Sequence, residues 1–578
     1  MISEIAPFIG WILATSSSLV SLDWVDSLII AIYFLFVLGI GYYLLRFTKT
    51  GEDFFLAGRK MTMWIAGLSF VAANLGSLEL MGWAASAYQY GILATHWYWI
   101  GAIPAMLFLA IVMMPFYYIS KTHSVPGYLK LRYGESASML SAVSFAFMTV
   151  LMSGINMFAM ALVMKVVLGW SLHFSIWVSS ITVMVYVVLG GLLSAIFNEV
   201  LQFMLIWLGA LVIPILGLVE AGGWSGMVAR IHQNFPIGNY THLWSTLGSF
   251  NDNPMGINWV GIVFGLGAVI SMAYWTTDFL VVQRVLSSKD LRAAKMAPII
   301  GAGFKMMVPF IVILPGLLGL ALMPGLVGQN QVNAMHPNSY NEVLPLMLAR
   351  YAGPGLLGLG ITALIAGFMS GMAGNVSAFA TVWTYDIYRP AHVYFTKKEQ
   401  TDEYYVRMGR WCTIIGVLVS IGTAYLVQQF ASIMDYVQAL FSFFVAPTFG
   451  VVLLGMLWKK ATPKAGFWGL FAGIGSSIAM WAWVDVLDPG ALKYIALSTY
   501  AQPMAENMFR ALWCFLIGVV VTIVVSLLSR PKPETELVGL VRGCTELPSE
   551  GHLPLIKRPI FWAGVVFAVF VVLQIIFW

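Results

Sequence analysis

Residues 69–83, SFVAANLGSLELMGW, lie inside a segment that is otherwise apolar enough to cross a membrane. Asn74, Gly76 and Ser77 are poor helix formers, and the carboxylate of Glu79 follows them. A charge at the centre of a bilayer costs about 2.5–3.5 kcal/mol, and non-helical backbone survives there only beside a cavity lined by protein. The stretch therefore predicts a broken helix whose polar face lines such a cavity.

The whole chain has the composition of a polytopic membrane protein. Of its 578 residues, 60% are hydrophobic and only 10% are charged, whereas a soluble protein carries roughly 25% charged residues. Cys412, Cys514 and Cys544 are the three cysteines, and they lie without metal-ligand spacing. We therefore expect neither a disulfide framework nor a zinc site.

Segments of about 20 apolar residues predict fourteen membrane spans. They cover residues 25–45, 62–88, 97–118, 137–168, 173–193, 196–220, 257–283, 297–323, 354–386, 411–428, 434–458, 466–487, 508–529 and 559–577. Residues 1–21 lack the basic start of a signal peptide, so they are expected to form an interfacial lead-in.

Basic residues check this assignment independently, because they gather in alternate loops. The loops on the other side contain only Lys165, Arg230, Arg350 and Lys493. By the positive-inside rule the basic loops are cytoplasmic, which places both termini outside. We therefore expect a multi-pass protein of the plasma membrane, or of the inner membrane if the source is bacterial.

A second polar interruption, YWTTD at residues 274–278, lies in the seventh span. Five spans separate the starts of the two interrupted spans, so the second unit would enter the membrane upside down. Such inverted repeats, each with a broken first helix, are typical of secondary transporters with a site at the midplane. In the alternative interpretation, the small residues of these helices merely allow close packing. The expected division is a lead-in and peripheral span (1–61), a first repeat (62–220), an extracellular loop (221–256), a second repeat (257–458) and three peripheral spans (459–578).

Four stretches carry a family resemblance: DFFLAGRKMTMWIAGLSFVAANLGS (53–77), AYWTTDFLVVQRVLSSKD (273–290), FKMMVPFIVILPGLLG (304–319) and MDYVQALFSFFVAPTFGVVLLGMLWKKATPKAG (434–466). They resemble the solute:sodium symporter family, and most of all its sodium/glucose and sodium/galactose cotransporter branch. The resemblance implies an all-α fold of the leucine-transporter type, a five-plus-five inverted repeat with extra flanking helices.

The resemblance also implies a sodium site between the second and ninth spans. Its ligands would be the carbonyl oxygens of Ala72, Leu75 and Gly367 and the hydroxyl of Ser370, oxygen ligands of the kind a hard cation prefers. The family commonly has two adjacent hydroxyl residues here, whereas this chain has Gly371 after Ser370. The missing hydroxyl weakens sodium binding, leaves a place for water or lets protons substitute. Gly367 and Gly371 also suit a packing seam of small residues.

A solute site is implied by the same resemblance. Tyr274 matches an inner-gate tyrosine that stacks on a pyranose ring, and Lys305 and Gln438 match sugar-hydroxyl partners. Trp83 and Trp97 fit as outer walls. The complete expected set is Glu79, Trp83, Trp97, Tyr98, Ser271, Tyr274, Lys305 and Gln438.

Other sugar contacts of the family are replaced. Tyr98 stands for a glutamate, and Met152 and Ser271 stand for asparagines, so a hexose would lose hydrogen bonds. Glu79 disfavours an anionic solute unless it is protonated or paired with Lys305. An inositol, an amino acid or a nucleoside therefore stays open as the solute.

Two further buried acids have expected roles. Glu199 stands where the family has an aspartate linked to cation coupling, and it either takes part in coupling or pairs structurally with a basic residue. Asp278, in the seventh span before Arg284, is expected to serve structure.

The sequence thus predicts a symporter that couples inward sodium flow to uptake of a monosaccharide by alternating access. A solute sensor without transport is the alternative from another class. No catalytic motif is supported by context, so we expect no enzyme. The expected partners are sodium, a small solute and membrane lipid, without nucleic acid, and the functional unit is expected to be a monomer.

Overall fold

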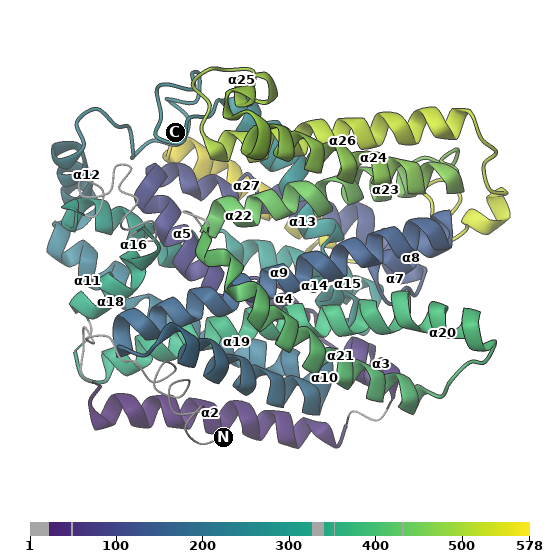
Figure 1. The fold of residues 1–578 in the computed structure, drawn as a ribbon, viewed down its shortest axis with the longest axis horizontal. Coiled ribbons are helices and arrows are strands. Elements are labelled where there is room, and N and C mark those ends of the chain that lie inside the picture. Colours follow the sequence, from purple (N-terminus) through teal and green to yellow (C-terminus); the bar gives the residue numbers. More distant parts are fainter. Residues whose placement is uncertain (1–21, 48–49, 326–339, 352, 430–432) are drawn as a thin grey trace.

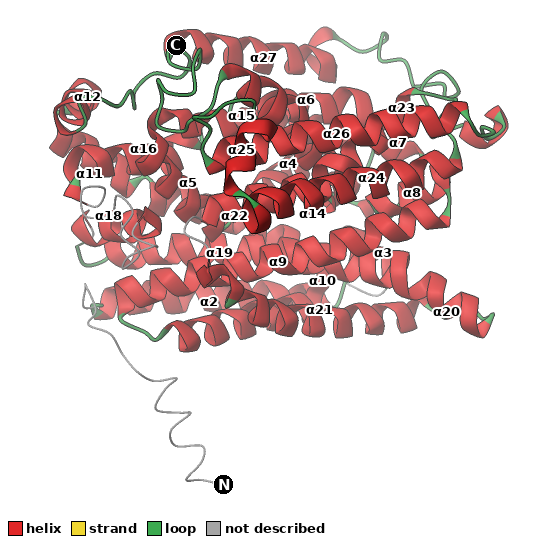
Figure 2. Cartoon of the chain, turned by 45° about the horizontal axis from the view of Figure 1, so that its top comes forward, coloured by secondary structure: helices red, strands yellow, loops and turns green. Residues whose placement is uncertain are grey.

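The computed structural model describes residues 22–47, 50–325, 340–351, 353–429 and 433–578. Within these ranges the chain forms a bundle of helices without strands (Figures 1 and 2). The all-α prediction is confirmed for this part of the chain. The lead-in predicted for residues 1–21 lies outside the described residues.

Long helices alternate with short ones along the chain. The first half contains α2 (Trp24–Leu45), α3 (Gly51–Leu56), α4 (Met63–Ala72), α5 (Ser77–Tyr90), α6 (Ile103–Phe108), α7 (Met114–Ile119), α8 (Val125–Tyr133), α9 (Glu135–Leu168), α10 (Leu172–Ala210), α11 (Val212–Ala221), α12 (Gly223–Asn234), α13 (Met272–Thr277) and α14 (Phe279–Leu286). The second half contains α15 (Leu291–Lys305), α16 (Pro309–Leu322), α18 (Val343–Tyr351), α19 (Leu356–Val382), α20 (Arg389–Thr396), α21 (Asp402–Ala424), α22 (Ile433–Leu440), α23 (Ala446–Leu457), α24 (Pro463–Trp481), α25 (Leu492–Ile495), α26 (Pro503–Leu527) and α27 (Pro559–Ile576).

Tighter or wider helical turns connect several of these helices. A 3₁₀ segment, η2 (Gly91–Trp97), continues α5, and a π-helical segment, η4 (Gly261–Ser271), leads into α13. Further π-helical segments join α6 to α7, α19 to α20 and α22 to α23, and lengthen α24: η3 (Leu109–Met113), η6 (Trp383–Tyr388), η8 (Phe441–Val445) and η9 (Ala482–Leu487).

The described residues contain nine helices that are long and apolar enough to cross a membrane, and two bent helix pairs raise the number to eleven. Two shorter apolar helices, Ile103–Ile119 and Leu172–Val185, fall below that length. Each of the fourteen expected ranges overlaps helix. The chain is therefore a multi-pass membrane protein, while the count of fourteen spans stays a prediction.

The first predicted break is confirmed. Helix α4 begins where the hydroxyl of Thr62 accepts the N–H of Ile65, and it ends at Ala72. Residues 73–76 then leave the helical path, and Gly76 is extended, with φ −82° and ψ 177°, before α5 starts. The axes on either side are bent by 55°. Local residue choice explains this break, because glycine and asparagine give a helix little support.

The second predicted break is also confirmed. Asp278 alone interrupts the helix, with φ −72° and ψ 115°, and the segments on either side are bent by 50°. Its carboxylate accepts the N–H of Leu280 at 2.9 Å and so caps the start of α14. Asp278 therefore serves structure, as an N-cap of the kind that short acidic side chains provide.

The halves of these broken helices occupy the middle of the bundle. Helices α4 and α14 contact each other, α4 packs against α10 and α15, and α5 packs against α16 and α19 (Figure 1). Helix α10 covers two expected spans and changes direction at Gly191, where φ is +56°. A residue with a side chain would be strained in that conformation.

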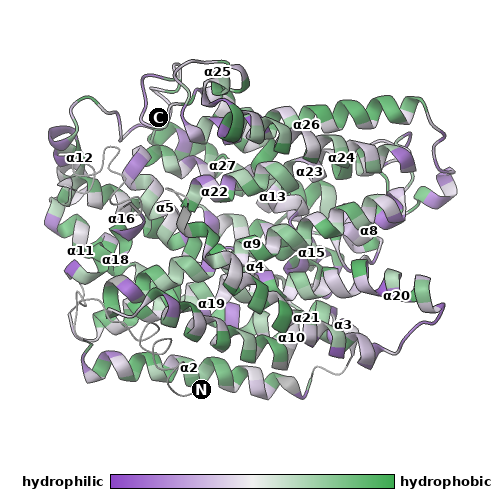
Figure 3. Ribbon diagram, in the orientation of Figure 1, coloured by the Kyte–Doolittle hydropathy of each residue, from purple (hydrophilic) through white to green (hydrophobic). Residues whose placement is uncertain are grey.

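One end of the bundle gathers the loops that were predicted to be extracellular. Arg350, in the last turn of α18, pairs with Glu220 at the end of α11, and the N–H of Trp244 donates to the carbonyl of Trp578. Asp26, in the first turn of α2, accepts the N–H of Gly358 in α19. In Figure 3, α2 is mostly hydrophobic, whereas α12 and the loop after α20 are hydrophilic. The side of the membrane on which each end lies stays a prediction.

Candidate functional site

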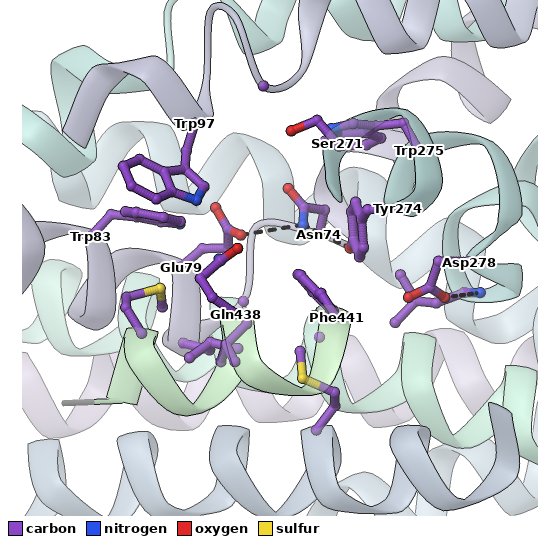
Figure 4. Close-up of a pocket in the computed structure, with 18 of the residues that line it drawn as sticks. Asn74, Glu79, Trp83, Trp97, Ser271, Tyr274, Trp275, Asp278, Gln438 and Phe441 are labelled. Carbon is purple, nitrogen blue, oxygen red and sulfur yellow. Dashed lines mark hydrogen bonds between the residues drawn. The ribbon is translucent and has the colours of Figure 1, made fainter. Parts of the chain in front are cut away.

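A cavity of about 780 Å³, including the open space at its mouth, lies where the two broken helices meet. It is lined by residues of the α4–α5 link, α5, η2, α9, η4, α13, α14, α15, α19, α22 and η8 (Figure 4). All eight side chains predicted for the solute site line it: Glu79, Trp83, Trp97, Tyr98, Ser271, Tyr274, Lys305 and Gln438. The structure thus brings the whole predicted set together, and their binding of a solute stays a prediction.

Asn74, in the break of the first repeat, is the centre of the polar network in this cavity. Its amide nitrogen donates to the hydroxyl of Tyr274 at 2.8 Å and to a carboxylate oxygen of Glu79 at 3.3 Å (Figure 4). Its amide oxygen accepts a short hydrogen bond from the ammonium group of Lys305. One side chain from the first break therefore contacts both expected repeats.

Glu79 and Lys305 form an ion pair at the wall of the cavity. The ammonium nitrogen lies 3.5 Å from the nearer carboxylate oxygen, and that oxygen also accepts the hydroxyl of Tyr98 at 2.5 Å. The same ammonium group lies 4.7 Å from the centre of the Tyr98 ring and 5.3 Å from that of Trp275. Pairing and the two aromatic faces together stabilise a charge that is almost fully buried.

Aromatic rings form two walls of the cavity. Trp83 and Trp97 lie with ring centres 4.9 Å apart on one side, and Tyr274 contacts Phe441 at the same centre distance on the other. Such rings present flat apolar faces with polar groups at their rims. The walls therefore suit a solute with an apolar face and a polar edge.

Two buried polar atoms of the cavity lack a hydrogen-bond partner among the described residues. They are the indole nitrogen of Trp97, a donor, and the amide oxygen of Gln438, an acceptor. Both side chains are more than nine-tenths buried and point into the cavity (Figure 4). A buried polar group without a partner costs about 1–3 kcal/mol, so a partner for either atom would stabilise the protein.

The predicted sodium ligands lie beside this cavity, in the seam between the α4–α5 link and α19. The hydroxyl of Ser370 donates to the carbonyl of Ala72 at 2.7 Å. A Cβ atom placed on Gly367 would lie 3.4 Å from the carbonyl oxygen of Leu75. Small residues let the two segments approach closely, so the packing seam and the predicted cation site coincide. The cation role of these residues stays a prediction.

Glu199 lies in a separate, fully buried network. Its carboxylate pairs with the guanidinium of Arg284 at 2.6 Å and accepts a short hydrogen bond from Ser69. Arg284 also donates to the carbonyl of Leu280 at 2.8 Å and to Ser377 at 3.3 Å. The geometry fits the predicted structural pair, and the coupling role stays untested.

Sequence reasoning missed several residues of the cavity. Asn74 and Trp275 were predicted as parts of the two breaks but not as site residues, and Asn156 and Phe441 were not predicted as site residues. Asn74 gave a usable signal, since an amide side chain in a broken helix can reach a cavity. Asn156 gave none, because it sits within the unbroken helix α9.

Comparisons with known proteins agree with this architecture. The model of the Sodium:solute symporter family matches residues 54–473. A solved structure of a Na+-coupled sialic acid symporter, in a substrate-bound outward-open state, superposes with a TM-score of 0.71 at 20% identity and covers 88% of this chain and 99% of its own. This likeness confirms the predicted leucine-transporter-type fold.

Three relatives extend the match over most of the chain. Sodium/glucose cotransporter 4 of Homo sapiens is 29% identical, over 95% of this chain and 82% of its own. Sodium/glucose cotransporter 1 of Ovis aries is 27% identical, over 89% and 80%. Sodium/myo-inositol cotransporter 2 of Oryctolagus cuniculus is 29% identical, over 78% and 69%.

The relatives are sodium-coupled transporters, which confirms the expected transport class, the absence of enzymatic activity and sodium as the transported ion. The chain belongs to the sodium:solute symporter family.

Proposed function

We propose that this protein couples inward sodium flow to the uptake of an uncharged monosaccharide by alternating access. The observation that carries the proposal is the paired Glu79–Lys305 couple in a cavity walled by aromatic rings. The names of the sodium/glucose relatives support the same class of solute.

The charge balance of the cavity favours an uncharged polyol. Glu79 and Lys305 offset each other, so an uncharged solute leaves the balance intact, whereas an anion would meet the carboxylate. A hydroxyl group both donates and accepts. One hydroxyl can therefore donate to Gln438 while another accepts from Trp97, and both atoms lack a partner without a solute.

Sodium binding is proposed to order the broken helix. A cation held by the carbonyls of Ala72, Leu75 and Gly367 and by Ser370 would fix the α4–α5 link against α19. The same link carries Asn74, which contacts Glu79, Tyr274 and Lys305. Ion binding and solute binding would thus favour the same arrangement, and this coupling must be reciprocal.

The energy available sets the expected accumulation. A tenfold sodium gradient supplies about 1.4 kcal/mol, and a potential of about 100 mV adds about 2.3 kcal/mol for one charge. With one sodium ion per solute, accumulation would reach roughly 500-fold.

Reconstituted protein tests the proposal. Liposomes containing the purified chain should take up labelled galactose or glucose under an inward sodium gradient and fail to do so in choline. Uptake that is equal in sodium and choline would reject the coupling. A competition panel of sugars, polyols and amino acids then identifies the solute.

An inositol is the second candidate solute. The sodium/myo-inositol cotransporter relative supports it, and the replaced sugar contacts at Met152 and Ser271 leave room for a different pattern of hydroxyls. Stronger competition by myo-inositol than by glucose or galactose would favour this candidate.

A further inference from the structure

Gly371 stands where a second hydroxyl residue is expected in the cation site. The space that its missing side chain would enter is bordered by the amide oxygen of Asn156. A Cβ atom placed on Gly371 would lie 3.1 Å from the amide oxygen of Asn156 and 3.2 Å from the Cα of Gly76. A side chain at position 371 would therefore enter the space beside an oxygen atom that comes from α9.

The amide of Asn156 is oriented by its own helix. The side chain is only 3% exposed, and its nitrogen donates to the carbonyl of Met152 at 3.2 Å. This bond turns the amide oxygen towards the start of α5, where it accepts a long hydrogen bond, 3.4 Å, from the N–H of Leu78. The oxygen thus keeps acceptor capacity in a buried place.

This oxygen and the carbonyl oxygen of Gly367, a predicted sodium ligand, both border Gly76. A point at the Cβ position of Gly76 is 2.8 Å from the Asn156 amide oxygen and 3.5 Å from the carbonyl oxygen of Gly367. On the same seam the hydroxyl of Ser370 contacts the carbonyl of Ala72. Amide oxygens are hard ligands of the type that alkali and alkaline-earth cations prefer.

We propose that Asn156 supplies the oxygen ligand that Gly371 lacks, so that the sodium site is built from the α4–α5 link, α19 and α9. This inference rests on the proposed sodium-coupled function. The sequence left three consequences of the missing hydroxyl open: weaker sodium binding, a water molecule in its place, or protons instead of sodium. A protein ligand from a third helix would take the place of all three.

Asn156 also gives the ion a direct connection to the solute cavity. Its carbonyl accepts the hydroxyl of Ser77 at 3.2 Å, its amide contacts Leu78, and its side chain lines the cavity. Ser77 and Leu78 begin α5, and Glu79 follows them. A cation on Asn156 would therefore hold α9 against the segment that carries the solute-binding carboxylate.

Sodium binding without any solute tests this assignment. Binding of radioactive sodium to purified protein should require about tenfold more sodium in Asn156→Ala than in the native chain. Asn198→Ala is the matched control, because Asn198 is another fully buried amide, on α10, whose nitrogen faces the carbonyl of Val37 in α2. The control should bind sodium as the native chain does.

A second substitution separates a ligand from a packing residue. In the Asn156→Ala background, Gly371→Ser should restore sodium affinity to within about threefold of native, because the hydroxyl can then occupy the space left by the Asn156 amide, and of the close contacts at position 371 only the one with the Cα of Gly76 remains. In the native background the same Gly371→Ser change should weaken binding, since its Cβ would crowd the Asn156 oxygen. Asn156→Asp keeps an oxygen in place and should change the ratio of sodium to lithium affinity.

Two results would overturn the assignment: native sodium affinity in Asn156→Ala, or a loss that Gly371→Ser fails to reverse. A failure of the proposed function would be seen in the native chain and not in the variants. A native chain that binds sodium but transports no sugar leaves the ion site testable, whereas a native chain that binds no sodium rejects both proposals.

Discussion

Two buried ion pairs connect the same two halves of the chain, but their surroundings differ. Glu199 and Arg284 are completely buried, and their nearest atoms lie 2.6 Å apart. Glu79 and Lys305 lie 3.5 Å apart, and the Glu79 side chain is 16% exposed. Each pair takes its acid from the expected first repeat and its base from the second.

The difference separates a fixed connection from one that a ligand can reach. Arg284 uses its remaining donors on the carbonyl of Leu280, on Gln283 and on Ser377. The Glu79–Lys305 pair instead borders the cavity and shares Asn74. A fully bonded buried pair resists change, whereas a pair at a cavity wall can exchange a partner for a solute hydroxyl.

The largest effect is expected at the fully buried pair of Glu199 and Arg284. Arg284→Ala leaves the Glu199 carboxylate buried without its cation, which costs about 3–5 kcal/mol. The melting temperature of the purified protein should fall strongly, and sodium-driven uptake should be lost with it. Thermal unfolding in detergent measures the first effect.

A double variant shows whether charge or packing is responsible. Glu199→Gln with Arg284→Gln removes both charges, so it should regain part of the lost stability. Native-like melting of Arg284→Ala would contradict the structural role. Glu199→Gln that melts normally but takes up solute independently of sodium would assign Glu199 to coupling instead.

The next effect is expected at Lys305. Lys305→Ala removes a donor to Asn74 and the counter-charge of Glu79, which costs about 1–3 kcal/mol. Since Glu79 keeps Tyr98 as a partner, melting should change less than in Arg284→Ala, while uptake falls at least about tenfold. The comparison requires both readouts on the same preparation.

Neutralising the partner sharpens this result. Adding Glu79→Gln to Lys305→Ala removes the unpaired carboxylate and should recover stability but not transport. Recovery of full transport would mean that neither charge contacts the solute. A fall in melting as large as that of Arg284→Ala would remove the distinction between the two pairs.

A smaller effect is expected for Glu79→Gln alone. The amide keeps the shape of the side chain and one acceptor oxygen, but it gives Lys305 no counter-charge. The Michaelis constant for the true solute should rise about tenfold, and stability should fall by less than in Lys305→Ala, because the ammonium group of Lys305 keeps the amide oxygen of Asn74 as an acceptor. An unchanged Michaelis constant would exclude Glu79 from the solute site.

Local composition was enough to predict the two breaks, because the residues that interrupt a helix lie at the interruption itself. Asn74, Gly76 and Asp278 are adjacent to the bends that they cause. The membrane class and the pairing of two interrupted spans followed from the same kind of information. The family resemblance then predicted the eight solute residues, and the structure places all of them around one cavity.

Contacts between distant segments could not be predicted from the sequence. Asn74 contacts Tyr274 and Lys305, which are 200 and 231 residues away, and no local pattern encodes those distances. Tyr98 was expected to mark a lost sugar contact, yet its hydroxyl binds Glu79. The approach of Asn156 to Gly371 depends on how α9 packs against α19, which only the folded chain determines.

The smallest effect is expected at an exposed pair, which completes the comparison by burial. Arg350 and Glu220 contact each other at the end of the bundle with side chains 42% and 35% exposed, and neither lines the cavity. Exposed ion pairs contribute about 0–1 kcal/mol, so Arg350→Ala should melt nearly as the native chain and transport solute at the native rate. Parallel melting and uptake curves with Arg284→Ala and Lys305→Ala check the order. If Arg350→Ala lost as much stability as Arg284→Ala, burial would not determine how much an ion pair stabilises this protein. The difference between the Glu199–Arg284 pair and the Glu79–Lys305 pair would then need another cause.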